Sequence, residues 1–298
     1  MIKEGADLPM EISVECISCL IDKGARQLQG YHDMRKRACM RDILKMMSEL
    51  EPGVSAPLAV YRMEAIIRRY YPKHDAYAER KRYDNKRMMA LKPRLEQRIR
   101  SSPKPLAEAI RYAIIGNYID FGALNEVKDE QIDAMLESNI SLPEDELSCL
   151  ASELRHAKKI AYLHDNCGEI ALDTLLIDEI HRQFPCEVMS IVRGEPVLND
   201  ATGADARMCG IDRYMGNGTA IAGTELSLIC DEARSWIDQS DLIISKGQGN
   251  FETLYGHGMN VYYLFLCKCE YFTRRFGLKQ FEGVFANERR MKTLRCGE

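Results

Sequence analysis

Polar loops follow short apolar segments in the second half of the chain. One apolar segment, 159–164, ends at Asp165 and Asn166, and the next, 186–192, leads into a loop that carries Asp200. Carboxylate and amide oxygens are the ligands that hard divalent cations prefer. The sequence therefore predicts one divalent ion held by Asp165, Asn166 and Asp200, with water and substrate oxygens in the open positions.

A third apolar segment, 241–245, ends at Lys246 in the stretch SKGQGNFE. The backbone N–H groups of residues 247–249 can hold phosphate oxygens there, with Lys246 as the counter-charge. A metal ion beside a phosphate-binding loop is the arrangement used for phosphoryl transfer or hydrolysis. The substrate-binding positions that we expect at these loops are Asp205, Lys246, Gly247, Gly249, Asn250 and Glu252.

Short segments rich in Val, Ile and Tyr alternate with helical patterns from about residue 158 onward. This alternation predicts a parallel sheet with helices on both faces. The expected strands are 159–164, 186–192, 241–245 and 260–266, and the expected helices are 170–184 and 225–239. Because parallel strands end at the same edge of a sheet, the three polar loops are expected to converge. An Asp-Asn pair at one such end is often only a helix cap. The prediction of a site therefore depends on all three loops lying at the same edge.

The first half of the chain is predicted to be helical. The expected helices are 14–30, 40–51, 57–71, 105–121 and 142–157, and two of them begin at a proline, which suits a first helical turn. We therefore expect a helical domain over residues 1–155 and an α/β domain over residues 156–298.

The composition is that of a soluble globular protein, with 46% hydrophobic residues and a net charge of −4. No apolar segment approaches the roughly 20 residues that span a bilayer, and the start of the chain lacks a signal-peptide pattern. A cytoplasmic protein with no membrane partner is expected. Residues 61–105 hold 14 Lys or Arg and 5 Asp or Glu. Without interleaved aromatic residues, this stretch is interpreted as a solvated helical surface and no nucleic-acid partner is expected.

Eleven cysteines are scattered along the chain, which favours reduced thiols over a disulfide framework. Cys16 and Cys19 form a CxxC, and Cys267 and Cys269 form a CxC far along the sequence. A structural cluster of Cys16, Cys19 and Cys269 could bind zinc or form a redox pair. Small buried hydrophobic side chains are the favoured interpretation, because no second CxxC completes a four-ligand pattern.

Several motifs occur together in an order that resembles one family. HDNCGEIALDTLLIDEI is similar to the D-N-x-G-E motif of the family known as domain of unknown function 89, the damage-control metal-dependent phosphatases. The segments that fit the stand-alone prokaryotic branch of that family, from near residue 11 to about residue 270, are ECISCL, GNYIDFG, VRGEPVLNDATGADA, GTAIAGTEL, DLIISKGQGNFETL and LFLCKCE. Cys167 stands where alanine is usual, and the tail after residue 275 matches no segment of the family.

This resemblance implies a Rossmann-like three-layer α/β/α core with an appended helical domain. It implies that Asp165, Asn166 and Asp200 bind one divalent ion (Mn, Mg, Ni or Co), and that Asn117 and Asp120 reach the site from the helical part. Lys246 matches the lysine that contacts the substrate phosphate. The implied activity is hydrolysis of phosphate esters of small, damaged or surplus metabolites, such as sugar phosphates or cofactor fragments.

Several alternatives stay open from the sequence. The predicted catalytic residues are Asp165 and Lys246, but the nucleophile is either the Asp165 carboxylate or a metal-bound water. A carboxylate methyltransferase that uses S-adenosylmethionine is a second possible function, although the first strand–helix loop is not glycine-rich. A non-catalytic protein that binds phosphorylated metabolites or metal is a third. The sequence predicts no oligomeric state.

Overall fold

The structure, a computed structural model, describes residues 10–72, 77–118, 129–138 and 140–291. Its described residues form a six-stranded sheet in the order β3-β2-β1-β4-β5-β6. The first five strands run parallel, and β6 pairs antiparallel with β5. The strands are β1 (Lys159–Leu163), β2 (Glu187–Val192), β3 (Tyr214–Gly216), β4 (Leu242–Lys246), β5 (Val261–Leu266) and β6 (Gly283–Asn287).

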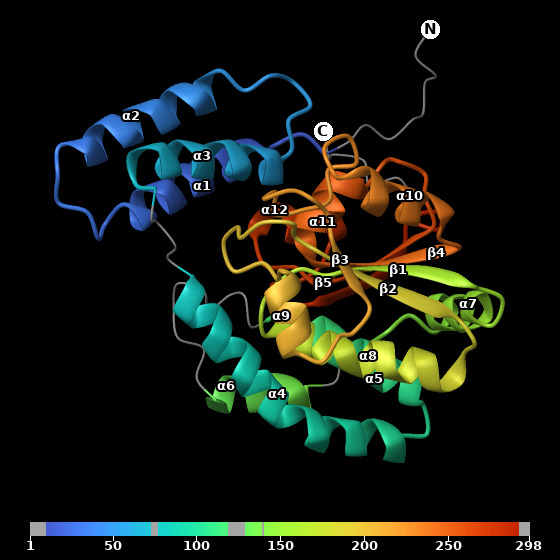
Figure 1. The fold of residues 1–298 in the computed structure, drawn as a ribbon. Helices are drawn as coiled ribbons and strands as arrows, with labels where there is room; N and C mark the ends of the chain where they lie inside the picture. Colours follow the sequence, from blue (N-terminus) through green and yellow to red (C-terminus); the bar gives the residue numbers. More distant parts are fainter. Residues whose placement is uncertain (1–9, 73–76, 119–128, 139, 292–298) are drawn as a thin grey trace, which may run out of the picture.

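Helices cover both faces of this sheet (Figure 1). One face carries α4 (Ala78–Ser101), α5 (Pro105–Gly116) and α8 (Glu169–Gln183), and the other carries α10 (Asp231–Gln239), α11 (Gly247–Leu254) and α12 (Glu270–Phe276). Further helices are α6 (Asp129–Glu137), α7 (Glu144–Leu154) and α9 (Gly203–Met208). The predicted three-layer α/β/α core is confirmed. None of the described helices is long and apolar enough to cross a membrane.

Strand β1 shows why the sheet needs helices on both faces. Ile160 and Tyr162 pack into the core shared with α5 and α8, whereas Ala161 and Leu163 pack into the core on the side of α10 and α11. Successive side chains of a strand point to opposite faces, so a strand that is apolar at every position must be buried on both.

The first three helices, α1 (Val14–Gln27), α2 (Arg35–Ser48) and α3 (Ala56–Tyr70), share a separate hydrophobic cluster (Figure 1). The Ser13 and Ser55 side chains cap α1 and α3 by accepting backbone N–H groups of their first turns. Helices α4 and α5, in contrast, share the core of the sheet with α8. The division of the chain into domains at residue 155 stays a prediction.

Some elements differ from those expected. Helix α4 has few apolar residues and contains Pro93, so it lacked a clear helical pattern. The helix expected from residue 225 begins only at Asp231. The short edge strand β3 and the strand β6, which lies in the tail after residue 275, were not predicted. Pairing of β6 with β5 gives that tail a structural role.

Candidate metal and phosphate site

The ends of β1 and β2 bring Asp165, Asn166 and Asp200 together. An antiparallel backbone bridge joins Asn166 to Asp200, and the backbone N–H of Ala201 donates to the Asp165 carbonyl oxygen at 2.8 Å. All three side chains are buried. Two carboxylates and an amide from two loops therefore lie at one place, as the convergence of the strand ends predicts.

Arg193, which the sequence interpretation missed, joins the two carboxylates. Its Nε donates to Asp200 Oδ2 at 2.7 Å, and its Nη2 lies 3.5 Å from Asp165 Oδ1. Its Nη1 donates to the Gly223 carbonyl and to Asn250 Oδ1. The residue is only 2% exposed. An arginine directly after the apolar segment 186–192 was the available signal, because a buried guanidinium needs carboxylate partners.

Asp165 and Glu169 fix the orientation of the Asn166 amide. Asn166 Nδ2 donates to Asp165 Oδ2 at 2.7 Å and to Glu169 Oε2 at 3.2 Å. Asn117 Nδ2 donates to the same Glu169 oxygen at 2.9 Å and to Asp165 Oδ2 at 3.3 Å. Because the Asn166 nitrogen faces the two acids, its carbonyl oxygen is the amide atom left to bind a cation.

Lys246 lies beneath this site with its ammonium group fully buried. Its Nζ contacts the Ala113 carbonyl at 2.6 Å, Glu169 Oε1 at 2.5 Å and Asp173 Oδ1 at 2.8 Å. Burial opposes the charged ammonium, but the two carboxylates outweigh it and raise the pKa of Lys246. The expected contact of Lys246 with a substrate phosphate stays a prediction, and a phosphate would have to replace one of these three partners.

The first turn of α11 lies directly against Asp165. Gly247 has φ +79°, and a Cβ atom there would overlap the Asp165 carboxylate. A Cβ at Gly249 would overlap the carbonyl oxygen of Ala222. The Gln248 side-chain nitrogen is buried without a hydrogen-bond partner. Close backbone approach and a free donor at a helix N-terminus suit an anionic ligand.

The electrostatics of Asp165 fit a cation. Burial, together with the negative charges of Glu169 and Asp200, raises the pKa of Asp165 well above its ordinary value, while Arg193 and Lys268 oppose that rise. Two buried carboxylates and an amide oxygen are the donor chemistry of a hard divalent ion, which would relieve the repulsion. In the described residues, no three His, Cys, Asp or Glu side chains are grouped to hold a metal. The predicted ligand set is not a group of this kind, because one of its three ligands is the amide of Asn166.

The other predicted binding residues have different surroundings. Asp205 accepts hydrogen bonds from Thr202 in a capping box and from Asn85 Nδ2 at 2.9 Å. Asn250 donates to the carbonyl oxygens of His164 and Lys246, so it holds the loops together. Asp120 lies outside the described residues. Substrate binding by all of these residues stays a prediction.

Glu252 lies close enough to Cys16 and Cys269 to affect both thiols. Burial raises the pKa of Glu252 to about 8, and its charge contributes to raising the pKa values of the Cys16 and Cys269 thiols, which burial raises most. All three predicted cluster thiols are free, and the charge of Cys19 also reaches Cys269. An ion pair between Glu15 and Arg274 holds the start of α1 against α12. The thiol cluster stays a prediction.

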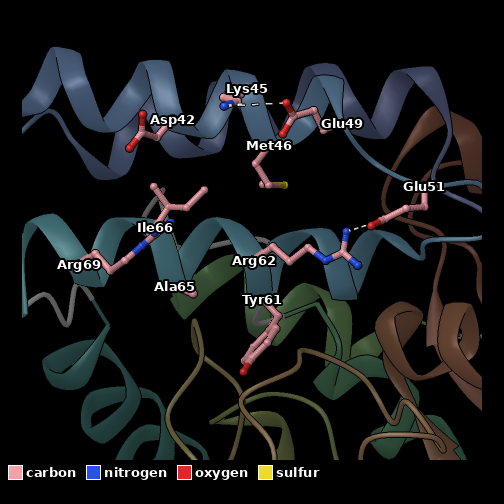
Figure 2. Close-up of a pocket in the computed structure, with 10 residues that line it drawn as sticks. All are labelled: Asp42, Lys45, Met46, Glu49, Glu51, Tyr61, Arg62, Ala65, Ile66 and Arg69. Atoms are coloured by element: carbon pink, nitrogen blue, oxygen red, sulfur yellow. Dashed lines mark hydrogen bonds and ion pairs between the residues drawn. The ribbon is translucent and has the colours of Figure 1, made fainter.

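A separate pocket of about 560 Å³ lies between α2 and α3 (Figure 2). Its charged groups largely pair with one another: Arg62 Nη1 lies 2.6 Å from Glu51 and Lys45 Nζ lies 4.0 Å from Glu49. It contains none of the predicted site residues. The pocket is lined by Asp42, Lys45, Met46, Glu49, Glu51, Tyr61, Arg62, Ala65, Ile66 and Arg69.

Comparisons with known proteins cover nearly the whole chain. Residues 12–284 match the family model described as the damage-control phosphatase ARMT1-like domain. A protein of Archaeoglobus fulgidus named damage-control phosphatase is 30% identical over 90% of this chain and 96% of its own. A damage-control phosphatase of Pyrococcus horikoshii is 27% identical over 87% of this chain and 92% of its own.

A crystal structure of a Pyrococcus horikoshii protein from the domain of unknown function 89 family has the same fold. It superimposes with a TM-score of 0.81 at 26% identity, covering 94% of this chain and 99% of that one. The family model spans most of the sequence and the structural likeness extends over the sheet and its helices. The chain therefore belongs to the damage-control phosphatase ARMT1-like domain family, also known as domain of unknown function 89.

Proposed function

We propose that this chain is a metal-dependent phosphatase that hydrolyses phosphate monoesters of small metabolites, such as sugar phosphates or cofactor fragments. The observation that carries the proposal is the convergence of Asp165, Asn166 and Asp200 around Arg193 at one edge of the sheet. The names of the two similar archaeal proteins support the same activity. A cytoplasmic location stays a prediction.

The cation would be Mn, Mg, Ni or Co, held by Asp165, Asn166 and Asp200. When bound, such an ion polarises a phosphoryl oxygen and offsets the charge that develops in the transition state. Arg193 keeps the two carboxylates in place, and Glu169 keeps the Asn166 carbonyl oxygen available. These contacts hold the donor oxygens in a fixed arrangement before the substrate arrives, which is how a preorganised site lowers a barrier.

Groups around Asp165 can bind the oxygens of the phosphoryl group. The unpartnered Gln248 nitrogen and the first turn of α11 offer N–H donors. Lys268 follows β5 and is close enough to lower the pKa of Asp165, so it brings a positive charge to the same place. In this proposal Lys246 acts on the site through Glu169, to which its ammonium group is bonded.

Phosphate release from a panel of phosphorylated sugars and cofactor fragments, each with Mg, Mn, Co and Ni, tests the proposal. We expect metal-dependent release that falls by about a hundredfold or more in Asp200→Asn, since a lost metal ligand removes transition-state stabilisation. Asp165→Asn is a second variant, in case loss of the Arg193 partner at position 200 unfolds the protein. Asp212→Asn, which changes an exposed carboxylate, is the matched control.

Other outcomes would favour the alternative functions. Metal and phosphate binding without turnover of any phosphomonoester would indicate a non-catalytic binding protein. Methyl transfer from S-adenosylmethionine to a carboxylate, without phosphate release, would indicate the methyltransferase. Full activity in both the Asp165 and the Asp200 variants would reject the proposed site.

A further inference from the structure

Helix α4 turns one face toward the candidate site, and that face begins with a lysine. Its buried polar and apolar positions include Lys81, Asp84, Asn85 and Met88. This spacing of three and four residues places the four side chains on one side of the helix. Lys81 is 8% exposed, which is unusual for a lysine.

Asn85 shows what this face of α4 contacts. Its Oδ1 accepts the backbone N–H of Gly168 at 2.6 Å, and its Nδ2 donates to Asp205 Oδ1 at 2.9 Å. Gly168 belongs to the loop that begins with Asp165 and Asn166, and Asp205 belongs to the loop after Asp200. The face that carries Lys81 therefore packs on both loops that supply the predicted metal ligands.

Lys81 lies one helical turn before Asn85 and is close to the same loop. Cys167 directly follows Asn166, and its Sγ lies 3.6 Å from the Asp200 carbonyl oxygen. Lys81 therefore shares the face of α4 that packs on the loops of the predicted metal ligands.

The other buried cations of this region have partners. Arg193 contacts Asp165 and Asp200, and Lys246 contacts Glu169 and Asp173. In contrast, no hydrogen bond or ion pair joins the Lys81 ammonium group to any residue in the described part of the chain. Lys81 Nζ is not among the fully buried side-chain atoms that lack a partner, so the end of this mostly buried side chain reaches solvent. An anion from outside the chain can therefore contact it.

We propose that Lys81 is a substrate-binding residue that contacts an oxygen of the phosphoryl group. The inference rests on the proposed phosphatase function and adds a residue from the first half of the chain to it. Basic residues are frequent in the stretch 61–105. Lys81 is mostly buried on the face of α4 that packs on the site loops, and its ammonium group has no hydrogen bond or ion pair with any described residue. The Nε atom of the neighbouring Arg80 donates to Asp84 Oδ2 at 2.7 Å, and its Nη2 is buried without a partner.

Binding of inorganic phosphate to the metal-loaded protein tests the role of Lys81. Titration calorimetry of wild type, Lys81→Met and Lys81→Arg should show the affinity falling about tenfold to a hundredfold in Lys81→Met and no more than severalfold in Lys81→Arg. Lys86→Met, on the exposed side of the same helix, is the matched control and should bind phosphate as the wild type does. KM for a phosphomonoester should follow the same order.

Thermal stability separates a binding role from a structural one. A lysine held for binding lacks a partner in the free protein, so Lys81→Met should melt at the same or a higher temperature than wild type without phosphate. Added phosphate should then stabilise the wild type and Lys86→Met more than Lys81→Met. A lower melting temperature of free Lys81→Met, with an unchanged response to phosphate, would show a structural lysine and overturn the inference.

The outcomes also distinguish this inference from the proposed function. Hydrolysis by the wild type with equal KM and phosphate affinity in Lys81→Met would reject the role of Lys81 and leave the phosphatase in place. Phosphate binding that depends on Lys81, in a wild type that hydrolyses no phosphomonoester, would reject the phosphatase and leave the binding site in place. A wild type that binds no phosphate would overturn the inference.

Discussion

Two constraints meet at the first residue of α11, Gly247. Its backbone has φ +79°, a conformation that costs residues with a Cβ roughly 1 kcal/mol or more. A Cβ there would also overlap the Asp165 carboxylate. The loop can therefore follow β4 and approach Asp165 only if this residue has no side chain.

Gly247→Ala should reduce kcat/KM by about a hundredfold, because a displacement of about 1 Å at a reacting group can have that effect. Gly258→Ala is the matched control: Gly258 has φ +69° but open space around its Cα, so this variant carries the backbone strain alone. Steady-state kinetics of both variants, with melting temperatures, check the prediction. Equal losses of activity in the two variants would show that backbone strain, rather than contact with Asp165, explains the effect.

The residues that could be predicted are those whose position follows from one strand end. Asp165 and Asn166 come directly after an apolar segment, and Asp200 lies in the loop after the next one, so their place at the edge of the sheet follows from the strand pattern. The bonding of Lys246 could not be predicted in this way, because its partners Glu169, Asp173 and Ala113 come from two helices. Which cation pairs with which buried acid depends on packing that a single segment does not encode.

Helix α11 connects the candidate site with the cysteine-bearing start of the chain. Its first turn lies at Asp165, and Glu252 on its next turn lies within electrostatic reach of Cys16 and Cys269. Burial raises the pKa of Glu252 to about 8, and no positive group among the described residues opposes this rise. The carboxyl group is therefore largely protonated at neutral pH in the folded protein.

Glu252→Gln should remove a pH-dependent loss of stability. The unfolded chain releases this proton near pH 4.5, whereas the folded chain holds it to about pH 8. Stability from this group is complete below the lower value and is lost as the pH rises toward 8. The melting temperature of Glu252→Gln, relative to wild type, should therefore increase between pH 5 and pH 8 and level off above that.

Thermal melts at half-unit pH steps, in the presence of a reducing agent, measure this difference. Glu232→Gln changes an exposed glutamate on α10 and serves as the control, with no pH trend expected. A difference that stays constant with pH, or that falls as the pH rises, would mean that Glu252 ionises at its ordinary pKa or has a positive partner.

Among the elements, the apolar strands could be predicted from the sequence. The short strand β3 and the polar helix α4 could not. Strands β1, β2, β4 and β5 are apolar because they are buried on both faces of the sheet. Strand β3 has only three residues, which is too few for a pattern. Helix α4 is polar and basic along most of its length, and its buried face contains Lys81, Asp84 and Asn85 in place of apolar residues. The polar residues of this face obscure the helical pattern in the sequence, and one of them, Asn85, bonds to the loops of the site.

Elements from across the chain meet at the candidate site. The residue after helix α5 is Asn117, the loops after β1 and β2 contribute the predicted metal ligands, and β5 ends near Lys268. Three of the carboxylates are packed close enough that Glu169 and Asp200 raise the pKa of Asp165. Without a bound cation the fold therefore contains repulsion at the point where its layers join.

Metal binding should stabilise the whole fold through Asp165. A ligand that binds only the folded state adds about 2.7 kcal/mol at a hundred times its Kd, which for a chain of this size corresponds to roughly 5 to 10 °C in Tm. Asp165→Asn keeps the shape of the side chain and removes one of the crowded charges. We expect this variant to melt at a higher temperature than wild type in the presence of a chelator, and to lose most of the shift produced by added Mn. Asp212→Asn, as the exposed control, should behave as wild type in both conditions. A full metal-induced shift in Asp165→Asn would show that the cation binds elsewhere, and a lower melting temperature in chelator would show that the Asp165 charge is compensated by Arg193 without any metal.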